Sequence, residues 1–138
     1  MIVDPAIEGY LHRWQPAPDP VLQAMEKVAE ERRFPIIGPL VGRLCEQLAR
    51  LMQARHIFEM GSGFGYSTYW FARALPDDGK VIHTDWDPQK SEEARTWLRR
   101  GGLEERVQFE VGDACQILER FAGPFDIIFI DIDKEAYP

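Results

Sequence analysis

Short apolar runs recur along the second half of the chain, and each has the length of a buried β-strand. They lie at residues 55–60, 80–84, 106–111 and 125–131. Segments with helical character separate them, at residues 67–75, 88–101 and 113–121. Strands that alternate with helices over short loops predict right-handed crossovers, and therefore an α/β fold with a parallel sheet and helices on both faces.

The first half of the chain is patterned differently. Residues 1–18 are expected to be irregular, because prolines are closely spaced there, and Asp19-Pro20 is typical of a capped helix start. That helix should run to about Arg33. Apolar residues then recur at helical spacing and predict an amphipathic helix whose apolar face lies on the sheet: Leu40, Val41, Leu44, Leu48, Leu51 and Met52. We expect a single domain over 1–138, with an N-terminal helical segment (1–35) and an α/β core (36–138).

The turn after the first predicted strand carries three glycines at alternate positions, Gly61, Gly63 and Gly65. Glycine adopts positive φ readily and has no side chain to block a close approach. The helix that follows would present free N–H groups and its positive dipole end to a ligand above the turn. Such a turn binds an anionic or polar part of a cofactor, although a tight turn without a ligand stays possible.

The glycine spacing bears on which cofactor is bound. A dinucleotide turn has the pattern G-x-G-x-x-G, and here the third glycine falls one residue early. Glu59, two residues before the first glycine, would repel a phosphate but suits a cofactor that carries a cation, such as the amino group of a methionine moiety. An acidic-G-x-G-x-G turn of this kind resembles the S-adenosylmethionine loop of class I methyltransferases.

Acidic residues follow the next two predicted strands. Asp85 lies 20 positions beyond Gly65, where nucleotide-binding α/β folds hold a ribose diol. Trp86 would lie against an adenine or cover the sheet edge. Asp87 precedes a proline and is interpreted as a helix cap. Asp113 would either accept a hydrogen bond from an adenine amino group or cap the helix that begins there.

The last predicted strand ends in a concentration of charged residues, Asp131, Asp133 and Lys134. We interpret this group as a polar site at the carboxyl end of the sheet, where open α/β folds bind ligands. The alternative is an acidic loop with a solvated lysine.

Composition excludes several classes of partner. A net charge of −7 argues against nucleic acid and anionic membranes, and no apolar run approaches the roughly 20 residues that span a bilayer. Cys45 and Cys115 are isolated, which is typical of small buried side chains in a reducing compartment, so we expect a cytoplasmic protein.

Taken together, the segments Glu59–Ser67, Asp85, Val111–Ala114 and Phe129–Tyr137 resemble the cation-dependent O-methyltransferases of the caffeoyl-CoA and catechol group. The similarity begins at about Pro35 and implies a Rossmann-like methyltransferase fold. It also implies S-adenosyl-L-methionine as the cofactor, and the cofactor-binding residues would be Ile37, Glu59, Gly61, Ser62, Gly63, Ser67, Asp85, Trp86, Asp113 and Ala114.

The resemblance also implies catalytic roles for Asp131 and Lys134. Asp131 would bind a divalent cation, with Mg²⁺ expected, and Lys134 would act as general base on a hydroxyl of a small phenolic or catechol-like acceptor. A hard cation with oxygen ligands lowers the pKa of such a hydroxyl, and a neighbouring lysine can then take the proton.

The chain departs from the family's pattern at its end. Family members continue with several more strands, the next of which brings an Asp-Asn pair to the metal site, whereas this chain stops at Pro138. A cofactor-binding or assembly module without turnover is therefore the alternative function, and a nicotinamide-dependent oxidoreductase is a third. The strand at residues 125–131 would have an open edge, so we expect self-association, with a homodimer through that edge as one form.

Overall fold

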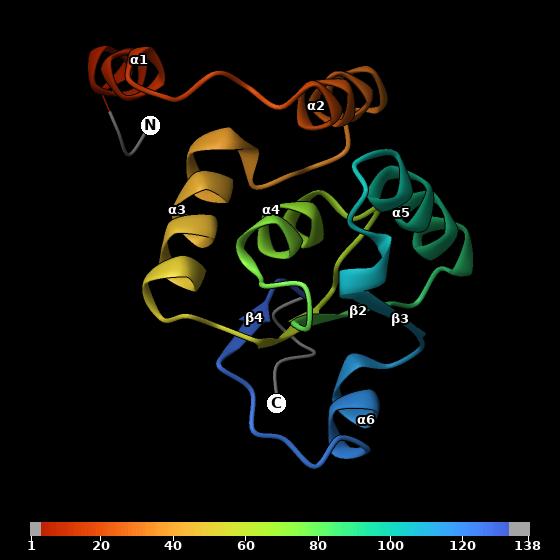
Figure 1. Cartoon of the computed structure of the whole chain (residues 1–138). Helices are drawn as coiled ribbons and strands as arrows, with labels where there is room; N and C mark the ends of the chain where they lie inside the picture. Colours follow the sequence, from red (N-terminus) through yellow and green to blue (C-terminus); the bar gives the residue numbers. More distant parts are fainter. Residues whose placement is uncertain (1–3, 133–138) are drawn as a thin grey trace.

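A parallel sheet lies at the centre of the computed structural model, which describes residues 4–132 (Figure 1). Its strands are β1 (His56–Met60), β2 (Lys80–Asp85), β3 (Val107–Val111) and β4 (Ile127–Ile130), in the spatial order β3-β2-β1-β4. All pairings among them are parallel. The predicted α/β fold is confirmed.

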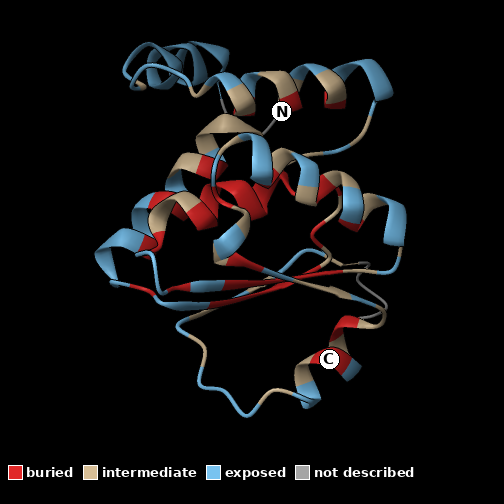
Figure 2. Ribbon diagram, turned by 45° about the vertical axis from the view of Figure 1, so that its right-hand side comes forward, coloured by how far each residue is buried: buried red, intermediate tan, exposed pale blue. Residues whose placement is uncertain are grey.

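Helices cover both faces of this sheet. One layer holds α3 (Gly38–Leu51), α4 (Tyr66–Ala74) and α5 (Pro88–Arg100), and α6 (Ala114–Glu119) lies on the opposite face (Figure 2). Two further helices, α1 (Pro5–Arg13) and α2 (Pro20–Arg32), lie outside the larger layer, and a 3₁₀ turn spans Glu104–Arg106. In Figure 2, α4 is the most deeply buried helix of the molecule.

The order of the strands determines where a ligand can bind. The chain moves from β1 outward to β2 and β3, and then returns to place β4 on the other side of β1. Open α/β sheets bind ligands at such a reversal, outside the carboxyl ends of the strands. β1 is therefore flanked by β2 and β4 at the predicted site, with Met60 in register with Thr84 and Ile130.

Apolar side chains fill the space on both sides of the sheet. The larger cluster joins α2, α4 and α5 to β1 and β2, and Phe71 and Leu98 are fully buried in it. The smaller cluster lies under α6, where the Phe58 ring meets Phe121 and Phe125 at centroid distances of 5.9 and 5.2 Å. This second cluster holds the short helix α6 against the sheet.

The prediction that residues 1–18 are irregular was wrong for residues 5–13 and is confirmed for residues 14–18, while residues 1–3 lie outside the described part of the chain. Residues Pro5–Arg13 form α1, and the Asp4 carboxylate accepts a hydrogen bond of 2.8 Å from the Ala6 N–H. Asp4-Pro5 is the same cap-and-proline signal that correctly predicted α2 at Asp19-Pro20. No residue of α1 is buried.

The predicted orientation of α3 was also wrong. The helix exists, but of the apolar residues expected to lie on the sheet, Leu40 is half-buried and the others are exposed: Val41, Leu44, Leu48, Leu51 and Met52. Its buried side instead consists of Gly42, Cys45, Glu46 and Ala49, and it packs mainly on α4. Small residues allow the two helices to approach closely, which large leucines would prevent.

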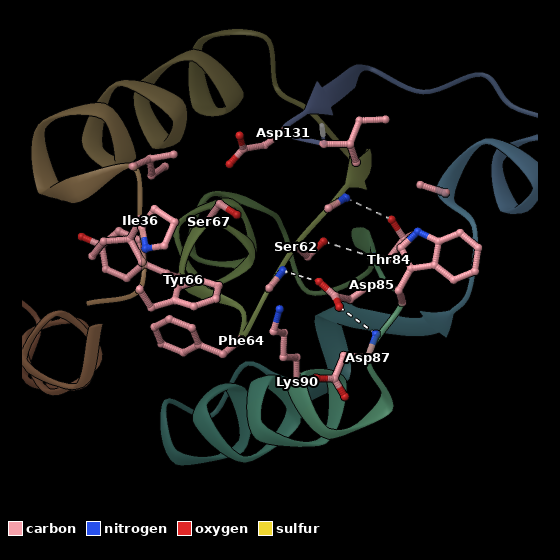
Figure 3. Close-up of a pocket in the computed structure, with 18 of the residues that line it drawn as sticks. Ile36, Ser62, Phe64, Tyr66, Ser67, Thr84, Asp85, Asp87, Lys90 and Asp131 are labelled. Carbon is pink, nitrogen blue, oxygen red and sulfur yellow. Dashed lines mark hydrogen bonds between the residues drawn. The ribbon is translucent and has the colours of Figure 1, made fainter. Parts of the chain in front are cut away.

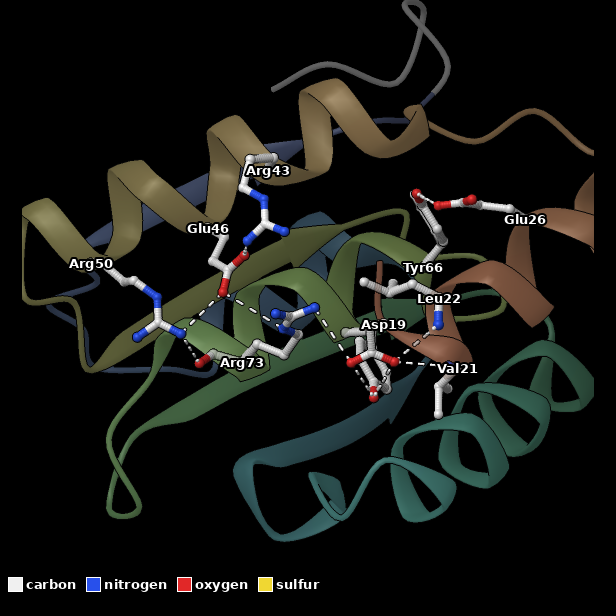
Figure 4. Close-up of polar contacts among 10 residues, drawn as sticks. Asp19, Val21, Leu22, Glu26, Arg43, Glu46, Arg50, Tyr66 and Arg73 are labelled. Carbon is white, nitrogen blue, oxygen red and sulfur yellow. Dashed lines mark hydrogen bonds and ion pairs between the residues drawn. The ribbon is translucent and has the colours of Figure 1, made fainter. Parts of the chain in front are cut away.

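A buried carboxylate stabilises this orientation of α3. Glu46 accepts hydrogen bonds from Arg43 at 2.7 Å and Arg50 at 3.0 Å, and lies 3.6 Å from Arg73 of α4 (Figure 4). Arg73 also reaches Asp19 at 3.4 Å, which ties the start of α2 to the same group. The arginines compensate the burial of Glu46, and this is why a charged residue can occupy the inner side of α3.

Among the described strands, β4 is an edge, as β3 is. Ile128 and Ile130 of β4 are exposed, so apolar side chains lie at the surface beside this edge in the described part of the chain. The expected self-association stays a prediction. No helix in the described part of the chain has both the length and the apolar character to cross a membrane.

Candidate functional site

A cleft of about 680 Å³ opens at the carboxyl ends of the central strands (Figure 3). Its walls come from the glycine turn after β1, the end of β2, the start of α6 and the segment between α2 and α3. Most of the predicted site residues line it: Ile37, Gly61, Ser62, Gly63, Ser67, Asp85, Trp86, Asp113, Ala114 and Asp131. The topology thus brings together residues that are up to 94 positions apart in the chain.

The glycine turn needs its glycines for two reasons. All three adopt positive φ, at 81° for Gly61, 54° for Gly63 and 93° for Gly65. A Cβ at Gly61 would overlap the backbone carbonyl of Asp131, and one at Gly65 would lie 2.7 Å from the Ala94 Cβ. The turn is therefore pressed against both β4 and α5, and its position is fixed before any ligand binds.

Asp85 is held in place by two backbone N–H groups. One carboxylate oxygen accepts from Gly63 at 2.9 Å and the other accepts from Asp87 at 2.9 Å (Figure 3). Each carboxylate oxygen keeps a further lone pair, so the group can still accept from a ribose diol in the cleft. Asp87 caps α5 by accepting from the Gln89 N–H at 2.8 Å, as predicted.

Hydrogen bonds join the turn to the end of β2. Thr84 donates its hydroxyl proton to the Glu59 carbonyl at 2.6 Å, and the Ser62 hydroxyl accepts from the Thr84 N–H at 3.1 Å. Both side chains are buried or nearly so. Thr84 lines the cleft and was missed by the sequence interpretation, which counted it only as part of a strand.

Glu59 lies under the turn and does not line the cleft. Its carboxylate accepts a hydrogen bond of 2.5 Å from the Thr68 hydroxyl in the first turn of α4. Desolvation raises the pKa of Glu59 to about 7, although hydrogen bonds from Ser67, Thr68 and Ser62 oppose the shift. Glu59 can support the turn from below. Its charge can also attract a positively charged part of a bound cofactor, but its side chain does not reach the open cleft.

His83 is a second buried anchor that the sequence did not indicate. Its Nε2 lies 3.1 Å from the Gly63 carbonyl oxygen, which can only accept, so Nε2 carries the proton. Burial lowers the pKa of His83 to about 4, and the imidazole is therefore neutral at physiological pH. Gly63 is thus held through its carbonyl by His83 and through its N–H by Asp85.

The segment between α2 and α3 covers one side of the cleft. The Phe34 ring meets Phe64 edge-on at 5.3 Å, and the Lys90 ammonium lies 5.2 Å from the Phe34 ring. Ile36 and Ile37 continue this wall. Ile37 was predicted, whereas the sequence analysis did not select Phe34 or Lys90 as site residues.

The far end of the cleft has a flat, partly apolar wall. Trp86 is 72% exposed, so one face of its indole is free to lie against a planar ring. Asp113 caps α6 by accepting from the Gln116 N–H at 2.9 Å and also lines the cleft, so both of its predicted uses are compatible with its position. Ala114 leaves room beside it.

The predicted metal and catalytic residues are only partly described. Asp131 lines the cleft, and its N–H donates to the Met60 carbonyl at 2.9 Å. Asp133 and Lys134 lie outside the described residues. Within residues 4–132, no group of three His, Cys, Asp or Glu side chains is placed to hold a metal. The described residues fit a nucleoside cofactor in the cleft, and the carboxylate that the sequence predicted to bind a cation, that of Asp131, lies at its edge.

Comparison with known proteins identifies the family. A family model described as O-methyltransferase matches residues 19–138. Among the curated relatives, a catechol O-methyltransferase of Niastella koreensis is 43% identical over 124 residues, which are 86% of this chain and 56% of the relative. Another, of Mycobacterium tuberculosis, is 36% identical and aligns with 95% of this chain and 61% of its own length.

A solved structure shows the same fold with a ligand. The O-methyltransferase TomG of Streptomyces achromogenes, in complex with S-adenosylmethionine, has a TM-score of 0.84 and 34% identity over 94% of this chain and 60% of that one. This chain therefore spans between half and two thirds of the length of these relatives. The match over residues 19–138 nonetheless shows that the chain belongs to the O-methyltransferase family.

Proposed function

We propose that this chain binds S-adenosylmethionine in the cleft and, with it, methylates a hydroxyl of a small phenolic or catechol-like acceptor. The observation that carries the proposal is the glycine turn whose backbone is held by Asp85 and His83 at the carboxyl ends of β1 and β2. In this arrangement Asp85 would accept from the ribose, while Trp86 and Ala114 would border the adenine. Gly61 and Ser67 would lie at the methionine end.

The reaction needs an acceptor oxygen in line with the methyl group. That oxygen forms a bond to the methyl carbon as the carbon–sulfur bond breaks, which leaves S-adenosylhomocysteine, and the hydroxyl proton goes to a base. The family resemblance assigns that base to Lys134. A divalent cation, when bound, would lower the pKa of the acceptor hydroxyl. Asp131 would contribute one of its oxygen ligands, because its position places it at the edge of the cleft.

Calorimetric titration tests the cofactor. S-adenosylmethionine should bind and NAD should not. The third glycine of the turn, Gly65, packs against Ala94 of α5, and it stands one residue earlier in the sequence than the third glycine of a dinucleotide turn. Binding of NAD but not of S-adenosylmethionine would favour an oxidoreductase.

A methyl-transfer assay with catechol and Mg²⁺ tests the reaction. Asp131→Asn should lower turnover at least tenfold and leave the affinity for S-adenosylmethionine within about twofold, because it removes one charged ligand from the cation and none from the cofactor. If the wild-type chain binds the cofactor and transfers no methyl group, the alternative of a binding or assembly module is correct. One observation favours that alternative: among the described residues, no three His, Cys, Asp or Glu side chains are grouped to hold a metal.

A further inference from the structure

One positively charged side chain lies among the described residues that line the cleft. It belongs to Lys90, in the first turn of α5, and the other charged residues of the lining are all acidic: Asp85, Asp87, Asp113 and Asp131. A cleft lined by carboxylates attracts the cationic parts of a ligand and repels the anionic ones. Lys90 therefore marks the place where an anionic group of a ligand would be favoured.

No carboxylate in the described part of the chain pairs with the Lys90 ammonium. Two arginines further along α5, Arg95 and Arg99, both pair with Glu104, at 3.5 and 2.7 Å. The Lys90 ammonium instead lies 5.2 Å from the centroid of the Phe34 ring. Such a cation–π contact holds the charge in place and leaves its N–H donors available to a ligand.

The Lys90 side chain points toward the glycine turn. In Figure 3 it extends from α5 between Phe64 and Asp85, with its nitrogen toward the turn. The Phe34 ring also lies against the turn, because a Cβ at Gly63 would be 3.2 Å from it. The ammonium is thus beside the turn on which the methionine part of the cofactor would lie.

Helix stability does not explain a lysine at this position. The first turn of a helix has free N–H groups and the positive end of the dipole, so acidic side chains are favoured there and cations are not. The first turn of α5 nonetheless contains no acidic residue and carries Lys90. A local choice that costs helix stability is typical of a functional site.

The proposed cofactor offers one partner for this cation. S-adenosylmethionine carries two positive groups, the sulfonium and the α-ammonium, and a single negative group, the α-carboxylate. The positive groups suit the acidic lining, whereas the carboxylate needs a cation or N–H donors. We propose that Lys90 binds the α-carboxylate of S-adenosylmethionine, an assignment that rests on the proposed function.

A lysine suits this contact for two reasons. Its four-carbon stem is flexible, so the ammonium can move from the Phe34 ring to the ligand, and it donates in three directions. The N–H groups at the start of α4, which begins at Tyr66 directly after the turn, would supply further donors to the same carboxylate. Lys90 thus allows an acidic cleft to hold a ligand that has a negative group of its own.

Two other roles for Lys90 lead to different results. A contact with the ribose hydroxyls would make Lys90 equally important for every ligand that contains adenosine. A purely structural contact with Phe34 would make the charge of residue 90 irrelevant to binding.

Calorimetric titration with two ligands separates these roles. One ligand is S-adenosylmethionine, and the other is its decarboxylated form, which lacks only the α-carboxylate. Lys90→Met removes the charge and keeps an unbranched stem against Phe34. It should lower the affinity for S-adenosylmethionine about ten- to a hundredfold and should not lower the affinity for the decarboxylated ligand. An equal loss for both ligands, or no loss for either, would overturn the proposal.

Reversal of the charge gives a sharper result. Lys90→Glu should lower the affinity for S-adenosylmethionine further than Lys90→Met does, and should raise the affinity for the decarboxylated ligand, because a carboxylate repels the first ligand's anionic group and attracts the second ligand's cations. An acidic residue is favoured in the first turn of a helix, so circular dichroism should show a retained fold. If both affinities fall together, residue 90 acts on the adenosyl part that the ligands share, and the proposal is wrong.

Lys27→Met is the matched control. It removes the same charge from α2, where the Lys27 side chain is 77% exposed and lies 3.9 Å from Glu31. The affinity of this variant for each ligand should equal that of the wild type, and a loss like that of Lys90→Met would assign the effect to net charge and overturn the proposal. A wild-type chain that binds neither ligand would overturn the proposed function itself. A wild type that binds S-adenosylmethionine, with both Lys90 variants unaffected, would overturn the role of Lys90 alone.

Discussion

At the scale of single residues, the site depends on side chains that fix the backbone of the glycine turn. Asp85, His83 and Thr84 all come from β2, and each bonds to a backbone group between Glu59 and Gly63. β2 therefore holds the turn that follows β1. The sequence predicted Asp85 from its position after a strand, but the contact partners of His83 depend on strand register, which no local pattern specifies.

Asp85→Ala should weaken binding of S-adenosylmethionine ten- to a hundredfold. The variant removes a charged acceptor from the ribose site, a loss of about 1.5–3 kcal/mol, and also releases the Gly63 N–H. Calorimetric titration measures the change.

Asp126→Ala is a matched control for that variant. Its carboxylate likewise accepts from two backbone N–H groups, those of Arg55 at 2.7 Å and His56 at 2.8 Å, but at the opposite end of β1. The affinity of the Asp126→Ala variant for S-adenosylmethionine should equal that of the wild type. Equal losses of affinity in both variants would assign the effect of Asp85→Ala to general destabilisation of the sheet.

Two buried groups, Glu59 and His83, should give the stability of this fold opposing dependences on pH. The pKa of Glu59 is raised from 4.5 to about 7, so between these values the native state binds more protons than the unfolded state and stability falls as pH rises. The pKa of His83 is lowered from 6.5 to about 4, so stability rises with pH across that range. Between about pH 4.5 and 6.5 the two effects partly cancel.

Glu59→Gln should remove one of these two contributions. Glutamine resembles the protonated carboxyl, so the stability of the variant relative to wild type should increase by about 2–3 kcal/mol between pH 5 and pH 8. Urea unfolding at several pH values measures this difference. Parallel curves for the two proteins would mean that Glu59 does not titrate in this range.

At the scale of elements, the sequence predicted which segments are helices and strands better than how they face. Period and capping signals depend on near neighbours, and they located α2, α4, α5 and α6 to within about two residues. The orientation of α3 depended on Trp70 and Arg73, which lie on another helix. Hydrophobicity alone predicted that the large apolar side chains of α3 would be buried. In the structure the side with Gly42 and Ala49 is buried instead, because small residues allow close packing on α4.

Gly42→Ala should destabilise the protein by about 1–3 kcal/mol. A Cβ at this position would overlap the Trp70 indole ring, whose centroid lies 5.0 Å from the Arg43 guanidinium and 5.2 Å from that of Arg73. Gly9→Ala in α1 is the control, because nothing lies within 4 Å of the new Cβ. It should be neutral or stabilise by about 0.5–1 kcal/mol through helix propensity. Denaturant unfolding of both variants would show whether the α3–α4 contact is as close as described.

At the scale of the whole molecule, the N-terminal region divides into two parts of different character. α2 buries Leu22, Met25 and Ala29 in the main cluster, while α1 buries nothing. The family model begins at residue 19, just before α2. The predicted boundary between the N-terminal helical segment and the α/β core, at residue 35, stays a prediction. The difference in burial between α1 and α2 instead favours a division between these two helices. The sequence could not show this, because α1 and α2 begin with the same signal.

Met25→Ala should therefore lower the free energy of unfolding by about 2–5 kcal/mol, since this side chain is fully buried. Tyr10→Ala, on the exposed face of α1, should change it by less than about 0.5 kcal/mol. Both are measured by urea unfolding at a dilution where the chain is monomeric, so that association does not contribute. A large loss in both variants would mean that α1 packs on the domain in solution. A small loss in both would mean that α2, too, is peripheral and that residues 36–138 hold the fold alone.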